Sequence, residues 1–373
     1  MFFKDVIGQE ALKKRLIQSV KDERISHAQL FSGPEGTGKI AMAIAYAQYI
    51  SCRNRSETDS CGVCPSCHKY NKLAHPDLHF VFPIFNPKGQ KPTSDDFIGQ
   101  WREMVLNDPY FDLGSWLTYI EADNAQGLIY ERESDSIYKK LNLKSFESEF
   151  KVMIIWLPEK MHVACANKLL KLIEEPPNKT LFILITEDEE DVIGTIRSRA
   201  QLVKFPFIDN ESVKSALLEI EGVDKDLIPD AVHLANGNFI KAKTYLNPAE
   251  DEQFYFQKFQ EMMRQAYKRE VLEQIQWAEE MAKIGRDKQK AFFAYALRMI
   301  REYFVMNMNQ SSMIFLSRKE KAWGKQFAPF INERNIVAFF NEFEKGITHI
   351  SWNGNPRIIF LDTALRMVRL IKR

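Results

Sequence analysis

Residues 33–39 read Gly33-Pro34-Glu35-Gly36-Thr37-Gly38-Lys39, with two glycines separated by four residues and followed by a lysine. This is the spacing of a phosphate-binding loop, in which backbone N–H groups of the glycine turn cradle phosphates and the lysine adds a positive charge. A short apolar stretch, 28–31, precedes the loop, and an almost wholly apolar stretch, 40–50, follows it. Glycine spacing alone could mark an ordinary strand-to-helix turn. The flanking strand and buried helix, together with Lys39, favour the opening unit of an α/β nucleotide-binding domain.

Beyond the loop, strand and helix patterns alternate. Further apolar runs typical of buried strands occur at 78–82, 152–156, 181–186 and 201–205. Helices are expected at about 9–20, 40–50, 128–142, 160–174 and 189–198. The alternation predicts a parallel sheet covered by helices on both faces. The stretch 86–118 is polar, contains several Gly and Pro residues and shows weak periodicity, so we expect it to be an insertion on the surface.

Two proline-containing boundaries divide the chain into three predicted domains. Pro206 ends the α/β domain, residues 1–206, and Asn247-Pro248 ends a small helical lid, residues 207–248. Residues 249–373 form long amphipathic helices with almost no strand pattern. The last domain is therefore expected to be all-α.

Composition limits the classes of function. The chain has 373 residues, 45% of them hydrophobic and 27% charged, with a formal net charge of +1. A protein that binds DNA alone through many phosphate contacts usually has a strong basic excess. The sequence contains no apolar run of the roughly 18 residues that cross a bilayer, and its first residues lack the apolar core of a secretory signal. We therefore expect a cytoplasmic protein without membrane association.

Four of the five cysteines, Cys52, Cys61, Cys64 and Cys67, fall within sixteen residues, spaced x8, x2 and x2. Clustered cysteines in an intracellular chain indicate a metal site before they indicate disulfides. Four thiolates in a tetrahedral array suit structural Zn²⁺ and leave no open position for catalysis. His68 is a possible substitute ligand. The alternative is four unligated thiols on an exposed loop, which would oxidise readily.

The phosphate loop lacks two features that ATP hydrolysis requires. The position after Lys39 normally carries Ser or Thr to hold Mg²⁺, and here it is Ile40. The strand 152–156 should end in acidic residues, but Trp156 takes the first of these positions and Glu159 lies beyond it. We therefore expect no ATP hydrolysis. ATP or ADP binding would be weak or absent, and the residues available for it are Gly33, Gly36, Gly38 and Lys39.

Several stretches together resemble the clamp-loader branch of the AAA+ superfamily. They are Ile7-Gly8-Gln9, residues 26–31, the four cysteines placed after the loop helix, residues 166–177 and residues 195–199. The resemblance covers nearly all of 1–246 and weakens beyond. It implies an AAA+ module with a zinc-binding insertion at 52–67 and a lid. It also implies that residues 249–373 are a collar, which ties loader subunits into a ring.

The departures from the family pattern indicate which kind of member this is. The family's ATPase subunit keeps both the Ser or Thr after the loop lysine and the acidic strand end, and this chain keeps neither. The serine–arginine–cysteine motif appears as Ser198-Arg199-Ala200, so the arginine is retained. The resemblance implies that Arg199 is a trans arginine finger, which faces the nucleotide pocket of a neighbouring subunit. The alternative is an arginine in a surface salt bridge. The sensor 1 position falls on Thr186, and sensor 2 on Ile240 or Lys241.

Three hypotheses follow. The preferred one is a non-catalytic clamp-loader subunit that helps to place a sliding clamp on primed DNA. Its implied partners are a gamma/tau-type ATPase subunit and a delta subunit, with the clamp and DNA reached through the complex. The second is an ATP-hydrolysing AAA+ motor subunit with unusual substitutions. The third is a stand-alone zinc-containing DNA-binding protein, against which the near-neutral charge argues.

Overall fold

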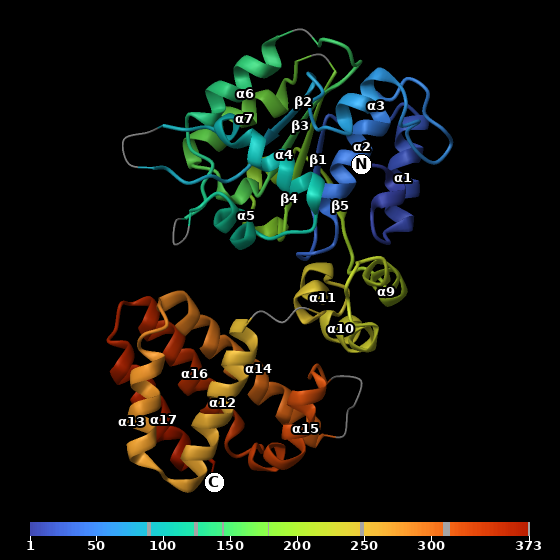
Figure 1. Ribbon diagram of the computed structural model, residues 1–373. Helices are drawn as coiled ribbons and strands as arrows, with labels where there is room; N and C mark the ends of the chain where they lie inside the picture. The colour runs from blue at the N-terminus through green and yellow to red at the C-terminus, as the bar shows by residue number, and fades with distance from the viewer. Residues whose placement is uncertain are drawn as a thin grey trace. The chain divides into compact units, whose positions relative to one another are not determined.

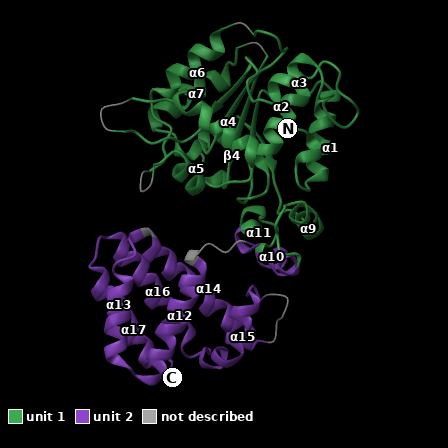
Figure 2. Ribbon diagram, in the orientation of Figure 1, with its two compact units in different colours: residues 1–225, 235–243 green, residues 226–234, 244–373 purple. Residues whose placement is uncertain are grey.

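The computed structural model describes residues 1–87, 91–122, 126–143, 145–177, 179–246, 250–308 and 314–371 (Figure 1). The chain forms two compact units (Figure 2). Unit 1 consists of residues 1–225 and 235–243, and unit 2 of residues 226–234 and 244–373. None of the helices in the described ranges is long and apolar enough to span a membrane.

Unit 1 is built on a five-stranded parallel sheet with the strand order β2-β3-β4-β1-β5. The strands are β1 (Ala28–Ser32), β2 (Leu78–Val81), β3 (Lys151–Trp156), β4 (Thr180–Thr186) and β5 (Gln201–Lys204). The strand β1, which leads into the phosphate loop, therefore lies between β4 and β5. Because parallel strands end at the same edge of a sheet, the loop after β1 shares that edge with the residues after β3 and β4.

The helices of this part of the chain are α1 (Glu10–Lys21), α2 (Lys39–Ser51), α3 (Pro65–Tyr70), α4 (Ile98–Asn107), α5 (Leu113–Tyr119), α6 (Glu133–Asn142), α7 (Val163–Glu174), α8 (Gly194–Arg197), α9 (Asn210–Leu218), α10 (Ile228–Ala235) and α11 (Phe239–Leu246). Short 3-10 turns lie at Phe3–Asp5, Ser94–Phe97, Pro158–Lys160, Glu189–Asp191 and Lys225–Leu227.

Helices cover both faces of the sheet, as predicted. The helices α6 and α7 pack on one face through residues such as Ile137, Leu169 and Ile173. The helix α2 contacts β3 and β4 and lies on the other side of the sheet (Figure 1). Every residue of α2 is buried, which explains its almost wholly apolar sequence.

The stretch 86–118, predicted to be a surface insertion with weak periodicity, contains regular helices in its described residues. They include the two helices α4 and α5, and the side chains of Trp101 and Trp116 are fully buried. The Trp101 ring stacks on Phe82, directly after β2, with centroids 4.2 Å apart. Helical periodicity was hard to see because the apolar anchors are few and large.

Unit 2 is helical in its described residues. Its long helices are α12 (Glu250–Lys268), α13 (Val271–Met281), α14 (Arg286–Asn307), α15 (Arg318–Phe327), α16 (Ile336–Ser351) and α17 (Pro356–Leu370), with a 3-10 turn at Ala328–Phe330. Their core is rich in aromatic side chains. The rings of Phe293 and Phe360 stack 4.7 Å apart, and Gly346 lets α16 approach the Phe293 ring closely.

The predicted fold class, a parallel α/β phosphate-loop domain combined with an all-helical C-terminal region, is confirmed. The division into 1–206, 207–248 and 249–373 stays a prediction. By their contacts, α9 and most of α11 fall in unit 1, and most of α10 falls in unit 2. The predicted boundary Asn247-Pro248 lies outside the described residues.

Candidate functional site

The phosphate loop connects β1 to α2, as predicted. Gly36 and Gly38 have φ values of +72° and +82°, a left-handed conformation that side chains rarely adopt. The surroundings also leave no room for side chains at the loop glycines. A Cβ on Gly33 would lie 2.3 Å from the Phe205 carbonyl oxygen, and one on Gly36 would lie 2.0 Å from the Asn238 side-chain oxygen.

The Lys39 ammonium is bound by its own loop. Its Nζ atom donates to the carbonyl oxygens of Gly33 at 2.5 Å and Pro34 at 2.6 Å. Burial lowers the pKa of Lys39 to about 8, although nearby carboxylates oppose this shift. A phosphate would therefore have to replace two hydrogen bonds that the ammonium already makes.

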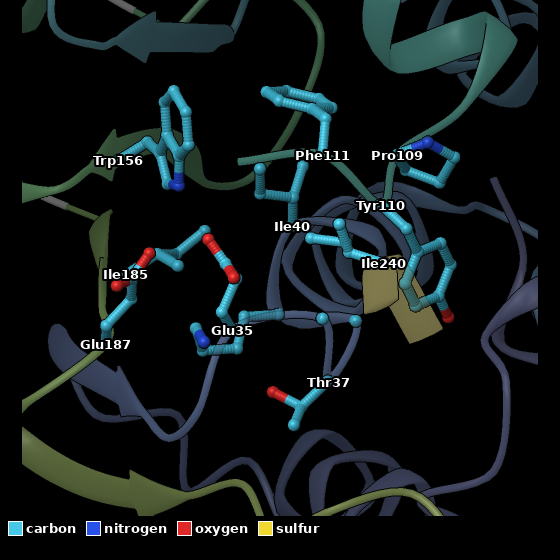
Figure 3. A pocket seen from close by; sticks show the side chains of 13 residues that line it. Glu35, Thr37, Ile40, Pro109, Tyr110, Phe111, Trp156, Ile185, Glu187 and Ile240 are labelled. Carbon is cyan, nitrogen blue, oxygen red and sulfur yellow. The ribbon is translucent and has the colours of Figure 1, made fainter. Parts of the chain in front are cut away.

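Three acidic side chains lie near enough to Lys39 to act on its charge. Glu187, Glu35 and Glu159 each act electrostatically on Lys39. Burial raises the pKa of Glu159 to about 7, and burial together with Asp112 and Glu187 raises the pKa of Glu35. In Figure 3, Glu35 and Glu187 lie on one side of the hollow beside the loop. Acidic groups this close to the loop lysine oppose the binding of a highly charged triphosphate.

The hollow itself is nearly filled. Its other side is lined by apolar and aromatic residues, namely Ile40, Pro109, Tyr110, Phe111, Trp156 and Ile240 (Figure 3). The remaining volume is about 30 Å³, which holds one or two water molecules. Pockets for small organic ligands usually measure about 300–1,000 Å³. The hollow in this conformation is therefore far too small for a nucleotide.

The two positions that should hold Mg²⁺ are apolar and buried. Ile40 is 5% exposed and Trp156 is 4% exposed. The Trp156 ring lies 5.3 Å, centroid to centroid, from both Trp101 and Phe111. The end of β3 is thus part of the hydrophobic core of the unit. Glu159 follows in the 3-10 turn Pro158–Lys160, and its Oε2 atom is buried without a hydrogen-bond partner.

The two sensor positions are also placed by the structure. Thr186 ends β4, is fully buried, and donates from its hydroxyl to the Asp188 carbonyl oxygen at 2.8 Å. Ile240 lines the hollow, whereas Lys241 is exposed. The residue of α11 that faces the loop is therefore an apolar one, which cannot bind a phosphate.

The structure brings the four predicted cysteine ligands together. The Sγ atoms of Cys52, Cys61, Cys64 and Cys67 all lie within 4.8 Å of one another, and those of Cys61 and Cys67 are 3.9 Å apart. Sulfur atoms at the corners of a tetrahedral Zn²⁺ site lie about 3.8 Å apart. The cluster could hold a metal ion such as Zn²⁺. The His68 side chain is exposed.

Backbone N–H groups support these sulfur atoms. The N–H groups of Cys61, Cys64 and Cys67 donate to the sulfurs of Cys52, Cys61 and Cys64, at 3.3, 3.4 and 3.5 Å. Such bonds, led by the one from Val63, lower the pKa of the Cys61 thiol to about 6. They favour the thiolate, which is the form that binds metal.

Arg199 lies between α8 and β5, where the sequence places it. Its guanidinium donates from Nη1 to the Thr195 carbonyl oxygen at 2.8 Å and contacts a Glu174 carboxylate oxygen from Nη2 at 2.6 Å. The Arg199 side chain remains 38% exposed. The Arg197 side chain is as exposed as that of Arg199, and its Nη1 atom lies 2.5 Å from a carboxylate oxygen of Glu190. The salt bridge named as the alternative for Arg199 is therefore present in the chain, at its surface.

Sequence reasoning missed several residues of the site. Glu187 directly follows β4, which neighbours β1, so the strand order would have placed it beside the loop. Glu35 lies within the loop itself. Tyr110 and Phe111 carried no signal, because they come from a segment far away in the sequence.

The sequence model of the family described as DNA polymerase III, delta subunit, matches residues 8–209. The chain is similar to DNA polymerase III subunit delta' of Bacillus subtilis, with 27% identity over 212 residues, 57% of this chain and 51% of that protein. It is also similar to subunit gamma/tau of Mycobacterium tuberculosis, with 27% identity over 231 residues, 62% of this chain and 33% of that protein. The matches thus span about half of the first relative's length and a third of the second's.

Among solved structures, the chain is similar to a DNA polymerase III gamma subunit-related protein from Thermotoga maritima. The two share 14% sequence identity with a TM-score of 0.43, and the match covers 96% of this chain and 99% of that one.

We predict that Glu159→Gln stabilises the folded chain at pH 8 and has little effect at pH 5. The folded-state pKa of about 7 lies above the ordinary value of 4.5. The folded chain therefore keeps a proton that the unfolded chain releases as the pH rises through this window, and stability is lost with it. Removing this loss should raise the free energy of unfolding at pH 8 by about 1–3 kcal/mol. Urea unfolding at both pH values measures the difference.

The control for this prediction is Glu219→Gln, since Glu219 is exposed at the end of α9. It should change stability little at either pH. An effect of Glu159→Gln that is equal at pH 5 and pH 8 would contradict the prediction.

Proposed function

The chain belongs to the family described as DNA polymerase III, delta subunit, and from this premise we propose that it is a non-catalytic, delta-prime-type clamp-loader subunit. In this role it assembles with gamma/tau-type ATPase and delta subunits and helps to load a sliding clamp onto primed DNA. Identity alone does not separate this role from that of an ATP-hydrolysing motor subunit, because delta' and gamma/tau relatives match at the same 27%.

The observation that carries the proposal is the state of the phosphate loop. The Lys39 ammonium is bound by Gly33 and Pro34, and the hollow beside it measures about 30 Å³. Phosphoryl transfer requires Mg²⁺ to bridge the phosphates and offset their developing charge. Ile40 and Trp156 replace the two expected anchors of that ion. These features favour a subunit that does not hydrolyse ATP over a motor subunit.

Arg199 is the residue that we propose acts on a neighbouring subunit. A guanidinium is planar and permanently charged, and it can bind a γ-phosphate as charge shifts in the transition state. Its bond to Glu174 lies at the surface, where ion pairs contribute only about 0–1 kcal/mol. A phosphate of the neighbouring subunit could therefore displace Glu174 at little cost.

We also propose structural roles for two further parts of the chain. The four cysteines would hold one Zn²⁺ that stabilises the insertion at 52–67, since the sulfur spacing fits a closed tetrahedral site. The helical region 249–373 would be the main assembly element. With a net charge of +1, the chain would reach DNA and the clamp through the complex.

We expect the isolated chain to show no magnesium-dependent ATP turnover above background. Ile40→Thr alone should not restore it, because Trp156 and the three carboxylates remain in place. The measurement is the steady-state rate of phosphate release from ATP by the native chain and by Ile40→Thr. Turnover by the native chain that disappears in Lys39→Ala would show that the motor hypothesis is correct.

Metal analysis of the purified chain should give one zinc per molecule. Cys64→Ser should reduce the bound zinc well below one and loosen the insertion, because three thiolates hold Zn²⁺ less tightly than four. Cys165→Ala is the matched control. Cys165 lies in α7 and is buried in the hydrophobic core beside the sheet, outside the four-cysteine cluster, so this variant should keep its zinc. Well under one zinc in the native chain would exclude the site.

In a loader reconstituted with the cognate gamma/tau-type and delta subunits, Arg199→Ala should reduce clamp- and DNA-stimulated ATP hydrolysis and clamp loading. A trans arginine contributes roughly 10³ to 10⁵ in rate at its own site, and the total would fall less because a ring has several sites. The mutant chain should still assemble and keep its zinc. ATP hydrolysis and clamp loading by the whole complex are the measurements.

Arg197→Ala is the matched control for Arg199→Ala, because both side chains are 38% exposed and both pair with a glutamate. It should leave loading unchanged. Normal loading with Arg199→Ala, or an equal loss with Arg197→Ala, would remove the proposed role of Arg199.

A further inference from the structure

Residues 146–148 lie shortly before β3 and far from the four cysteines in the sequence, but they are bonded to side chains that adjoin those cysteines. We call these residues the entry segment. We propose that metal binding by the four-cysteine cluster holds the entry segment in place as well as the insertion, through the buried side chains of Ser51 and Tyr70. This inference rests on the proposed zinc site and goes beyond it, since it gives the metal an effect on the chain where it enters the sheet.

Ser51 and Tyr70 are each tied to a cysteine of the cluster by a short piece of chain. Ser51 ends α2 and directly precedes Cys52. Tyr70 ends α3, the short helix that contains Cys67. The hydroxyl oxygens of Ser51 and Tyr70 are hydrogen-bonded at 2.9 Å, and both side chains are buried. A movement of Cys52 away from Cys67 would therefore break this bond as well.

The same serine contacts the entry segment. Ser51 Oγ accepts a hydrogen bond from Ser148 Oγ at 3.0 Å, so one buried hydroxyl joins α3 to the segment that leads into β3. The helix α3 makes a second contact with this segment, because Lys69 pairs with Glu147. That ion pair is partly exposed, where such pairs contribute little. The buried bonds of Ser51 are therefore the stronger link between the cysteine cluster and the entry segment.

A buried carboxylate holds the backbone of the entry segment. Asp77 directly precedes β2 and is 1% exposed. Its two carboxylate oxygens accept three backbone N–H groups at 2.7, 2.8 and 2.8 Å, those of Phe146, Glu147 and Ser148. A buried charge is stable only while it keeps such partners. The position of Asp77 and that of the entry segment therefore depend on each other.

His75 connects Asp77 to α3. Its Nδ1 atom accepts the Asp77 N–H at 3.1 Å, and its ring lies against the Tyr70 ring with centroids 4.8 Å apart. The side chains of His75, Asp77 and Tyr70 are all buried. If loss of the metal loosens α3, Tyr70 no longer covers this group. Water can then compete for the carboxylate that holds the entry segment.

The entry segment has little packing of its own to keep it in place. The Phe146 side chain is 78% exposed, so it buries little apolar surface. A segment with few buried apolar contacts opens locally when its hydrogen bonds are weakened. We therefore expect the three N–H groups bound to Asp77 to exchange faster whenever the link through Ser51 and Tyr70 is lost.

Hydrogen–deuterium exchange on the full chain tests this, followed in a peptide covering residues 145–150, which contains the N–H groups bound to Asp77. Removal of zinc with EDTA should raise exchange there roughly five- to tenfold and leave exchange in β4 unchanged. Ser51→Ala removes the bonds to Tyr70 and Ser148 without removing a cysteine. It should raise exchange in 145–150 by a similar factor in a chain that still binds one zinc.

Ser66→Ala is the matched control. Ser66 is a buried serine of α3 whose hydroxyl has no hydrogen-bond partner among the described residues, so this variant should exchange like the native chain. Unchanged exchange in 145–150 for Ser51→Ala with one zinc bound would overturn the proposal and leave the zinc site intact, even if EDTA unfolds all of unit 1. A native chain without zinc would overturn the zinc site and this proposal with it. The proposed lack of ATP hydrolysis is judged separately, by turnover.

Discussion

The hydrogen bonds from the Lys39 ammonium to the carbonyl oxygens of Gly33 and Pro34 determine the character of the site. A buried charge is costly unless it is paired and hydrogen-bonded. In this chain the loop carbonyls supply the hydrogen bonds, and the nearby acidic side chains Glu187, Glu35 and Glu159 favour the charged form of Lys39 electrostatically. The surroundings of the loop can then be apolar, and the aromatic side chains of Tyr110 and Phe111 lie beside it.

The two cationic side chains Lys39 and Arg199 differ in their exposure to solvent. The Lys39 ammonium is buried in unit 1, where it is hydrogen-bonded to its own loop. The Arg199 guanidinium contacts the Thr195 carbonyl, the Ser198 hydroxyl and the Glu174 carboxylate, but at the surface. The first group is therefore suited to hold a structure, and the second to exchange one partner for another.

Much of the fold and of the candidate site could be predicted from the sequence, because the residues that indicate them are neighbours in the chain. The strand before the loop, the buried helix after it and the close spacing of the cysteines each depend on residues that are neighbours in the chain. The absence of Mg²⁺-binding side chains at Ile40 and Trp156 could likewise be identified from their positions in the sequence. The contributions of Glu187 and Tyr110 could not, since they depend on strand order and on a distant segment. The two helices within 86–118 were not predicted for a related reason, because Trp101 and Trp116 are buried by tertiary packing on Phe82 and are not marked by a clear helical period.

The glycines of the loop have packing roles of their own, independent of any bound phosphate. Gly36 and Gly38 adopt positive φ values, and Asn238 and Tyr110 occupy the space where their side chains would be. A larger residue at either position would be strained and would displace a buried contact. Packing alone is therefore sufficient to require these glycines. The spacing of the motif identifies the fold of the loop, and the groups around Lys39 decide whether a phosphate can bind there.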